Sequence, residues 1–387
     1  MGGLKLVGEK ANQAIEEEDV EGEELSLRPW DPKDIRITTK NFTVREIYTQ
    51  INEGDLDLAP DFQRSFIWKN RQQIRLIESI LLGIPLPAFY FNQDEIGAHQ
   101  VIDGVQRLTT ISLFMSDKIS LEEEHMEYLK PLQGLSYSTL DPGTKRRFAG
   151  TQIVAHVIEP QTPDEVKYDI FNRVNTGGTP LSAQEIRHCM SKELSRKLLT
   201  DLVELESFDM ATGYAFWKNG PDGESCRDDR RMSDREMALR FCAFRNFSVD
   251  KYSQYASLDS YLLEFTRHLD KILADTDEYD EIIADFDRAM YNCCEILGGL
   301  AFRRYQYASD RRGPINRAIF ESQALALADY EMDDIDSHKE EIFEGFLELF
   351  NTPAYDSAVK SGTGDVLKIQ RRLEMPKKML ERILNDN

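Results

Sequence analysis

The sequence predicts an α+β protein, in which a small mixed-sheet domain is followed by an all-helical domain. Short strand-like apolar runs alternate with amphipathic helices as far as Met190. Beyond Met232, apolar residues recur almost without interruption at the 3.6-residue period of a helix. The chain has 387 residues, which is long enough for two domains with cores of their own.

Changes in composition set the predicted domain limits. Residues 1–34 are acidic and poor in apolar side chains, so we expect a mobile tail there. Residues 35–215 would form the mixed-sheet domain, and residues 216–387 would form the helical domain. The helical half shows no repeat of fixed length, which argues against a solenoid.

The elements of the first domain follow from local signals. Short apolar runs bounded by turn residues predict strands at residues 35–38, 87–93, 99–102 and 151–160. Apolar periodicity predicts helices at residues 43–54, 74–83, 108–114, 162–174 and 182–190. Thr43 with Glu46, and Ser182 with Glu185, have the spacing of capping boxes, and Thr162 would cap a third helix.

Charge and composition limit the classes of function. The net charge is −22, from 47 basic and 69 acidic residues, so overall charge does not favour nucleic acid. Basic residues nevertheless cluster at residues 145–147, 227–231, 303–304, 311–312 and 371–372. These clusters are either local contacts for nucleic acid or an acidic partner, or solvated helix faces with ordinary ion pairs.

Other sequence signals concern metal, redox state and location. The five cysteines form no CxxC pair and the histidines are scattered, so we expect reduced thiols and no structural zinc. Neither a long apolar segment nor the apolar core of a signal peptide is present in the sequence, so we expect no membrane span and a cytoplasmic protein.

The stretch "VIDGVQRLTTI" predicts a strand, a polar elbow and a helix. The elbow would lie at a helix N-terminus, where free backbone N–H groups and the helix dipole attract anions. Gly104 would allow a ligand close to the backbone, and Arg107 could bind phosphate oxygens. Asp103, Gln106 and Thr109 could hold a metal, a sugar hydroxyl or a water. The alternative is a polar turn in which Arg107 pairs with a structural carboxylate.

Two further stretches carry polar residues in patterns that suit a ligand. In "FNRVNTGGTP", consecutive glycines between two helices could present N–H groups to an anion. Its candidate residues are Asn172, Arg173, Asn175, Thr176, Gly177 and Gly178. The alternative is a linker with a left-handed glycine cap. In "PDFQRSFIW", Arg64 could face a cleft or form a salt bridge that holds a strand.

Together the three stretches resemble the signature blocks of the GmrSD-type N-terminal domain. That family belongs to the ParB/sulfiredoxin-like superfamily and occurs in modification-dependent restriction and other phage-defence proteins. The resemblance covers about residues 37–230. It implies a site for an NTP with Mg²⁺, of undetermined base, in which Asp103, Gln106 and Arg107 support hydrolysis and Asp103 contacts the metal. The pocket would be completed by Arg64, Gly104, Thr109, Asn172, Arg173, Asn175, Thr176, Gly177 and Gly178.

Two departures from the family pattern shape the functional hypothesis. Val105 replaces the usual glutamine of the elbow, which removes one polar contact. Many relatives carry a C-terminal His-Asn-His nuclease, whereas His268 and His338 begin no such motif here. We therefore expect a nucleotide-binding, NTP-hydrolysing sensor or regulatory subunit that acts with DNA or a separate nuclease or effector protein. The alternatives are an acidic interaction protein, antitoxin-like or DNA-mimicking, and a ParB-like metal-dependent nuclease.

Overall fold

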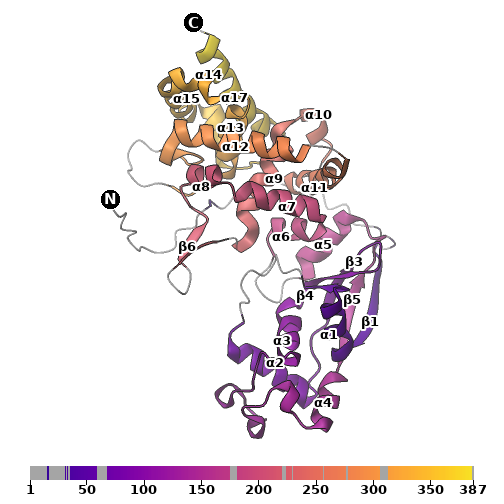
Figure 1. Cartoon of the computed structure of the whole chain (residues 1–387). Helices are drawn as coiled ribbons and strands as arrows, with labels where there is room; N and C mark the ends of the chain where they lie inside the picture. Colours follow the sequence, from indigo (N-terminus) through magenta and orange to yellow (C-terminus); the bar gives the residue numbers. More distant parts are fainter. Residues whose placement is uncertain are drawn as a thin grey trace. The chain divides into compact units, whose positions relative to one another are not determined.

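The computed structural model divides the chain into two compact units, one of residues 28–190 and one of residues 1–27 with 191–387 (Figure 1). The residues that it describes are 15–16, 31, 33, 35–58, 68–174, 181–219, 224–228, 230–255, 257–275, 278–305 and 313–385. The division after Met190 groups residues 191–215 with the helical unit, whereas the sequence-based limit lies at residue 215.

The first unit contains the mixed sheet that the sequence predicts. Its described strands are β1 (Ile37–Thr43), β2 (Leu56–Asp57), β3 (Phe89–Gln93), β4 (His99–Asp103) and β5 (Gln152–Ile158). Their order is β1-β5-β3-β4-β2. β1 pairs antiparallel with β5 and β3 antiparallel with β4, while β3 with β5 and β2 with β4 are parallel. The α+β prediction is confirmed.

Helices cover both faces of this sheet. The helices are α1 (Val44–Glu53), α2 (Asn70–Leu82), α3 (Val105–Met115), α4 (Pro142–Ala149), α5 (Asp164–Val174) and α6 (Ala183–Met190), with short 3₁₀ turns at Glu123–His125, Lys130–Leu132 and Tyr137–Thr139. Successive strand residues point to opposite faces, so Val101 joins the core under α1 to α4 and Ile102 joins a smaller cluster under α5 and α6.

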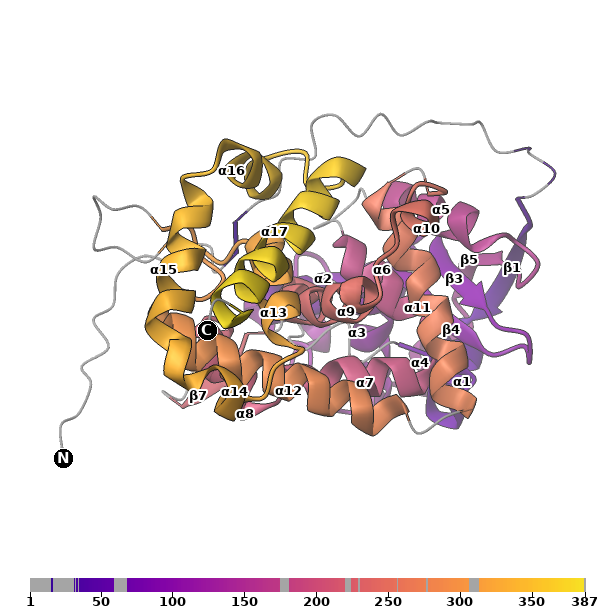
Figure 2. The ribbon, with the colours of Figure 1, turned by 90° about the horizontal axis from the view of Figure 1, so that it is seen from above.

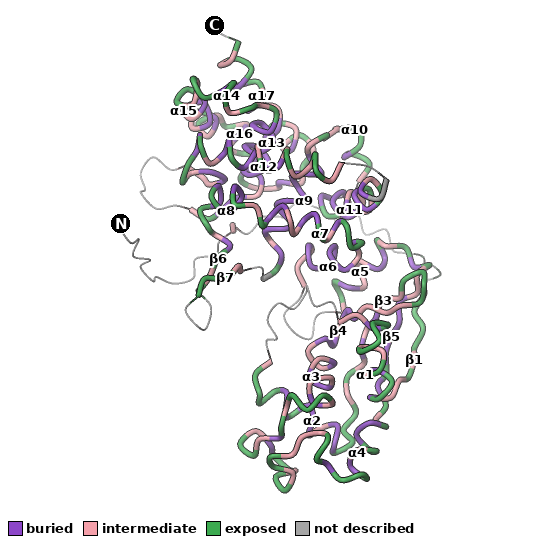
Figure 3. Tube along the Cα trace, viewed as in Figure 1, coloured by how far each residue is buried: buried purple, intermediate pink, exposed green. Residues whose placement is uncertain are grey.

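The second unit is almost entirely helical. Its helices are α7 (Glu193–Val203), α8 (Glu206–Thr212), α9 (Ser233–Arg245), α10 (Val249–Tyr252), α11 (Leu258–Asp275), α12 (Glu278–Leu297), α13 (Arg317–Leu327), α14 (Met332–Ile335), α15 (Lys339–Phe350), α16 (Pro353–Lys360) and α17 (Val366–Asn385), with 3₁₀ turns at Arg230–Met232, Gly298–Leu300 and Asp336–His338. Helices α9 and α13 are buried along most of their length (Figure 3). Helix α17 packs against α13 and α16 (Figure 2).

A short antiparallel hairpin in this unit was not predicted. It consists of β6 (Trp217–Asn219) and β7 (Ser225–Arg227). Each strand has three residues, which is too short for an alternating pattern to be recognised in the sequence. None of the helices in the described ranges combines the length and the apolar character needed to cross a membrane.

The capping signals are confirmed at two helices and wrong at one. The Thr43 hydroxyl accepts from the amide of Glu46 at 3.2 Å, and the Ser182 hydroxyl accepts from the amide of Glu185 at 3.1 Å. Helix α5 begins at Asp164, and the Thr162 hydroxyl instead bonds both backbone groups of Arg36, at 3.2 and 3.0 Å. The Thr162 prediction fails because a segment distant in sequence provides competing partners.

Candidate functional site

The elbow between β4 and α3 has the geometry that the sequence predicts. Strand β4 ends at Asp103, helix α3 begins at Val105, and Gly104 lies between them with a φ of 103°. A Cβ at Gly104 would lie 2.3 Å from the ring of Phe89, so both the left-handed backbone and the close approach require glycine.

The N-terminus of α3 presents backbone amides without a side-chain cap. The first helical hydrogen bond runs from the amide of Leu108 to the carbonyl of Gly104, at 2.9 Å. Glycine has no side chain that could accept from the first-turn amides, and α3 has no side-chain cap bond within the described residues. These amides and the positive end of the helix dipole are the elements of an anion site.

Arg107 braces the elbow from inside the unit. Its Nη1 donates to the carbonyl of Pro87 at 2.5 Å, and its Nη2 donates to the carbonyl of Ala88 at 3.3 Å and to Oδ2 of Asp103 at 3.1 Å. Its guanidinium carbon lies 4.1 Å from the centre of the Phe89 ring. Burial lowers the pKa of Arg107, and the charge of Asp103 opposes that effect.

These contacts match the alternative in which Arg107 pairs with a structural carboxylate. The Arg107 side chain is 13% exposed and that of Asp103 is 35% exposed. A guanidinium has five N–H donors, and three of them make the contacts described above. That Arg107 binds a ligand stays a prediction. The structure shows that Arg107 also holds the elbow in place.

Gln106 connects the elbow to the end of the "PDFQRSFIW" stretch. The amide of Trp68, the last residue of that stretch, donates to Oε1 of Gln106 at 3.3 Å. Arg64 lies outside the described residues. Thr109 is half-buried on α3, one turn beyond the elbow.

The start of the glycine-rich stretch also lies near the elbow. Phe171 and Ile102 belong to the same small apolar cluster, so the last turn of α5 packs close to the end of β4. Asn172 and Arg173 follow Phe171 in that turn and are exposed. The remaining candidates of this stretch, Asn175, Thr176, Gly177 and Gly178, lie outside the described residues.

Sequence reasoning missed the partners that hold Arg107. Two of them are backbone carbonyls, of Pro87 and Ala88, and a carbonyl carries no signal in the sequence. It also missed an exposed group elsewhere in this unit, in which Glu122, Glu124 and His125 have ligand atoms within 4.8 Å of one another. His125 already pairs with both of these carboxylates.

The described part of this unit thus combines a mixed sheet, a glycine-bearing strand–helix elbow, and the end of one and the start of another polar stretch near that elbow. Residues 44–191 match the model of the family described as GmrSD restriction endonuclease, N-terminal domain. Over these residues the match confirms the resemblance to the GmrSD-type N-terminal domain that the motifs indicate. No curated protein matches the chain.

Proposed function

We propose that this protein is the nucleotide-binding, NTP-hydrolysing sensor or regulatory subunit of a restriction-like phage-defence system. One observation carries the proposal: within a GmrSD-type domain, the uncapped N-terminus of α3 lies beside Arg107 and close to the exposed end of α5. The two ends offer an anion both backbone amides and positive charge.

The phosphates would bind at the first turn of α3. The amides of that turn would donate to phosphate oxygens, since Gly104 offers no side chain that could cap them. Arg107 would contribute charge from a fixed position, because Asp103 and two carbonyls hold its guanidinium. Arg173, which is exposed on α5, would approach the phosphates from the second stretch.

Asp103 is the residue that would contact Mg²⁺. Mg²⁺ in nucleotide sites is commonly held by one or two carboxylates together with phosphates and waters. The 35% exposure of Asp103 leaves its carboxylate within reach of such a metal, although Oδ2 also accepts from Arg107. The donor set therefore fits an ion that is held mainly by the nucleotide, and Mg²⁺ would neutralise phosphate charge there.

Hydrolysis would depend on Asp103 and Gln106, which would orient a water. Val105 is 7% exposed and packs in the apolar core of the first unit, so it offers the ligand no polar group. We therefore expect the nucleotide to bind measurably and to be hydrolysed slowly. The helical unit would convey the nucleotide state to DNA or to a separate nuclease or effector protein, in which we place the cutting activity.

The test is to measure binding and hydrolysis of ATP, GTP, CTP and UTP with Mg²⁺, in the presence and absence of DNA. Arg173→Ala changes an exposed side chain and should weaken binding by a factor of about 10 to 150, since a charge-assisted hydrogen bond contributes about 1.5–3 kcal/mol. Arg107→Ala should abolish turnover. Arg75→Ala, which removes an arginine from an exposed ion pair with Glu127, is the matched control and should behave as the wild type.

Two results would overturn the proposal. One is the absence of binding and turnover with all four nucleotides, which would favour the acidic interaction protein. The other is equal activity in the wild type and both the Arg107 and Arg173 variants. Thermal unfolding of each variant separates loss of the ligand site from loss of the fold, because Arg107 also braces the elbow.

A further inference from the structure

Two residues of the acidic N-terminal segment, Ile15 and Glu16, contact the helical unit. Ile15 forms an isolated parallel bridge with Ile315 and packs against the apolar core of that unit. The amide of Glu16 donates to the carbonyl of Ile315 at 2.8 Å. For these two residues the structure differs from the mobile tail that composition predicts.

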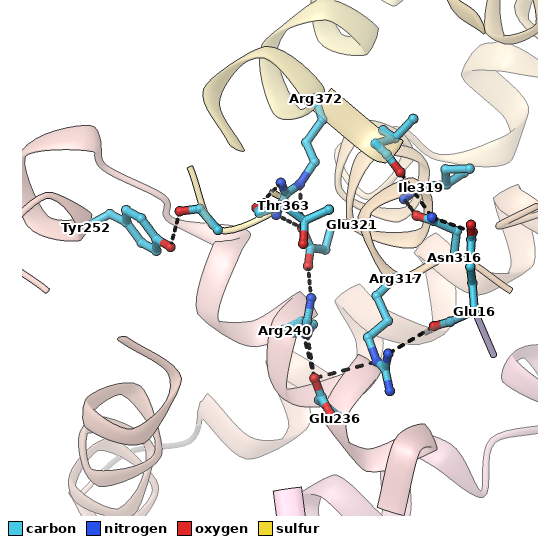
Figure 4. Close-up of polar contacts among 12 residues, drawn as sticks. Glu16, Glu236, Arg240, Tyr252, Asn316, Arg317, Ile319, Glu321, Thr363 and Arg372 are labelled. Carbon is cyan, nitrogen blue, oxygen red and sulfur yellow. Dashed lines mark hydrogen bonds and ion pairs between the residues drawn. The ribbon is translucent and has the colours of Figure 1, made fainter. Parts of the chain in front are cut away.

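The side chain and the carbonyl of Glu16 have partners of their own (Figure 4). Oε2 of Glu16 accepts from Nδ2 of Asn316 at 2.8 Å. Oε1 of Glu16 lies 3.8 Å from Nε of Arg304. The Glu16 carbonyl accepts from Nη1 of Arg317 at 3.4 Å. We call Arg304, Ile315, Asn316 and Arg317 the tail site.

Neighbouring groups hold the donors of the tail site in place. Asn316 is 5% exposed, donates to the carbonyl of Val359 at 3.1 Å, and caps α13 by accepting from the amide of Ile319 at 2.9 Å. Arg304 pairs with Asp356 at 3.1 Å and donates to the same Val359 carbonyl at 2.9 Å.

Arg317 joins the tail site to a buried ionic network. Its Nε lies 3.6 Å from Oε1 of Glu236, which accepts from Arg240, and Arg240 in turn donates to Glu321 at 3.0 Å. Glu321 also pairs with Arg372 (Figure 4). Because these groups are fixed by the fold, a ligand that binds here does not have to order them.

The contacts select a particular kind of ligand. The bridge, the amide bond of Glu16 to Ile315 and the bond of Arg317 to the Glu16 carbonyl favour an extended peptide. The core contact of Ile15 favours an aliphatic side chain, and the Asn316 and Arg304 contacts favour a carboxylate on the next residue. This is strand-type recognition, in which main-chain bonds supply affinity and side-chain contacts supply specificity.

We propose that the tail site is a peptide-binding site for an extended aliphatic–glutamate sequence, and that the N-terminal segment of the same chain is its resident ligand. The docked residues group with the helical unit and are tethered to it by the chain itself. A ligand tethered in this way is held even at millimolar intrinsic affinity, because its effective concentration is of that order. We call residues 15 and 16, docked on the tail site, the latch.

A labelled peptide of residues 11–19, ANQAIEEED, tests the proposal on the full-length chain. The double variant Ile15→Asp/Glu16→Lys should empty the tail site and bind the peptide at least tenfold more tightly than the wild type, measured by fluorescence anisotropy. Adding Asn316→Ala to this variant should reduce that binding. Val20→Asp/Glu21→Lys makes the same chemical changes at the next aliphatic–glutamate pair of the segment and is the matched control.

Equal peptide binding to the wild type and the double variant, or binding to neither, would overturn the proposal. Hydrogen exchange of the unmodified protein gives a second measurement that does not depend on how a variant folds. The amide of Glu16 should be protected, because it donates to Ile315, and exchange at the rate of a free peptide would contradict docking. A concentration-dependent dimer that the Ile15/Glu16 change abolishes would overturn the intramolecular form of the latch.

Discussion

Replacement of Gly104 by alanine tests the packing of the elbow most sharply. The added Cβ would lie 2.3 Å from Cδ1 and 2.7 Å from Cε1 of Phe89, and 3.0 Å from Nη2 of Arg107. Phe89 is fully buried and its ring lies against the Arg107 guanidinium, so the ring cannot move away without disturbing the core and the elbow together.

Two physical terms set the size of the effect. An L-residue in left-handed backbone costs roughly 1–2 kcal/mol relative to glycine. Forcing an extra carbon into a packed core adds about 1–3 kcal/mol. We therefore expect Gly104→Ala to lower the free energy of unfolding of the first unit by about 2–5 kcal/mol.

Gly54→Ala is the matched control. Gly54 also has left-handed backbone, with a φ of 83°, at a helix end, and a Cβ there would meet nothing within 4 Å. Gly54→Ala should lower the free energy of unfolding only by the cost of the left-handed backbone, about 1–2 kcal/mol. Urea denaturation followed by hydrogen exchange in peptides from α3 reports the stability of this unit separately from the other. Equal losses of unfolding free energy in Gly104→Ala and Gly54→Ala would refute the close approach of Phe89 to the elbow.

Three other predictions concern buried polar groups. Burial opposes ionisation of Glu78, but hydrogen bonds from three backbone amides and the charge of an arginine lower its pKa below the ordinary value. The stability that the ionised carboxylate adds is therefore present above about pH 4.5 and is lost as the pH falls through the pKa of Glu78 in the folded protein. Glu78→Gln should cost about 1.5–3 kcal/mol at pH 7 and less at pH 3, as measured by urea denaturation. Arg372→Leu removes one of the two arginines that pair with the fully buried Glu321 carboxylate and should cost about 1.5–3 kcal/mol, whereas Lys378→Ala at an exposed pair should leave the melting temperature almost unchanged. A thiol reagent should label exposed Cys226 in the native protein, but should label Cys242, whose pKa burial raises to about 12, only after unfolding.

The parts of the fold that the sequence predicted are those with local causes. The elbow was predictable because an apolar strand, a glycine and a helical period follow one another within fifteen residues. The boxes at Thr43 and Ser182 were predictable because both partners lie on the same turn. The family resemblance, confirmed over residues 44–191, likewise depends on short contiguous motifs.

The parts that were missed depend on partners distant in the sequence. Thr162 was expected to cap a helix, but its hydroxyl bonds Arg36, which is 126 residues away. Arg372 belonged to a cluster expected to lie on a surface, yet it is fully buried against Glu321, 51 residues away. A charged side chain is recognised as buried only when its partner is known. Residues 15–16 docked on the helical unit were missed for the same reason.

We propose that the elbow and the glycine-rich stretch bind the same triphosphate. Photo-crosslinking with ATP and GTP analogues that carry an azidoanilide on the γ-phosphate, followed by mass spectrometry of the digested protein, tests it most directly. We expect adducts in both the 104–109 and the 172–178 peptides, and excess unlabelled nucleotide should suppress these adducts. Adducts in only one of these peptides, or in neither, would contradict it.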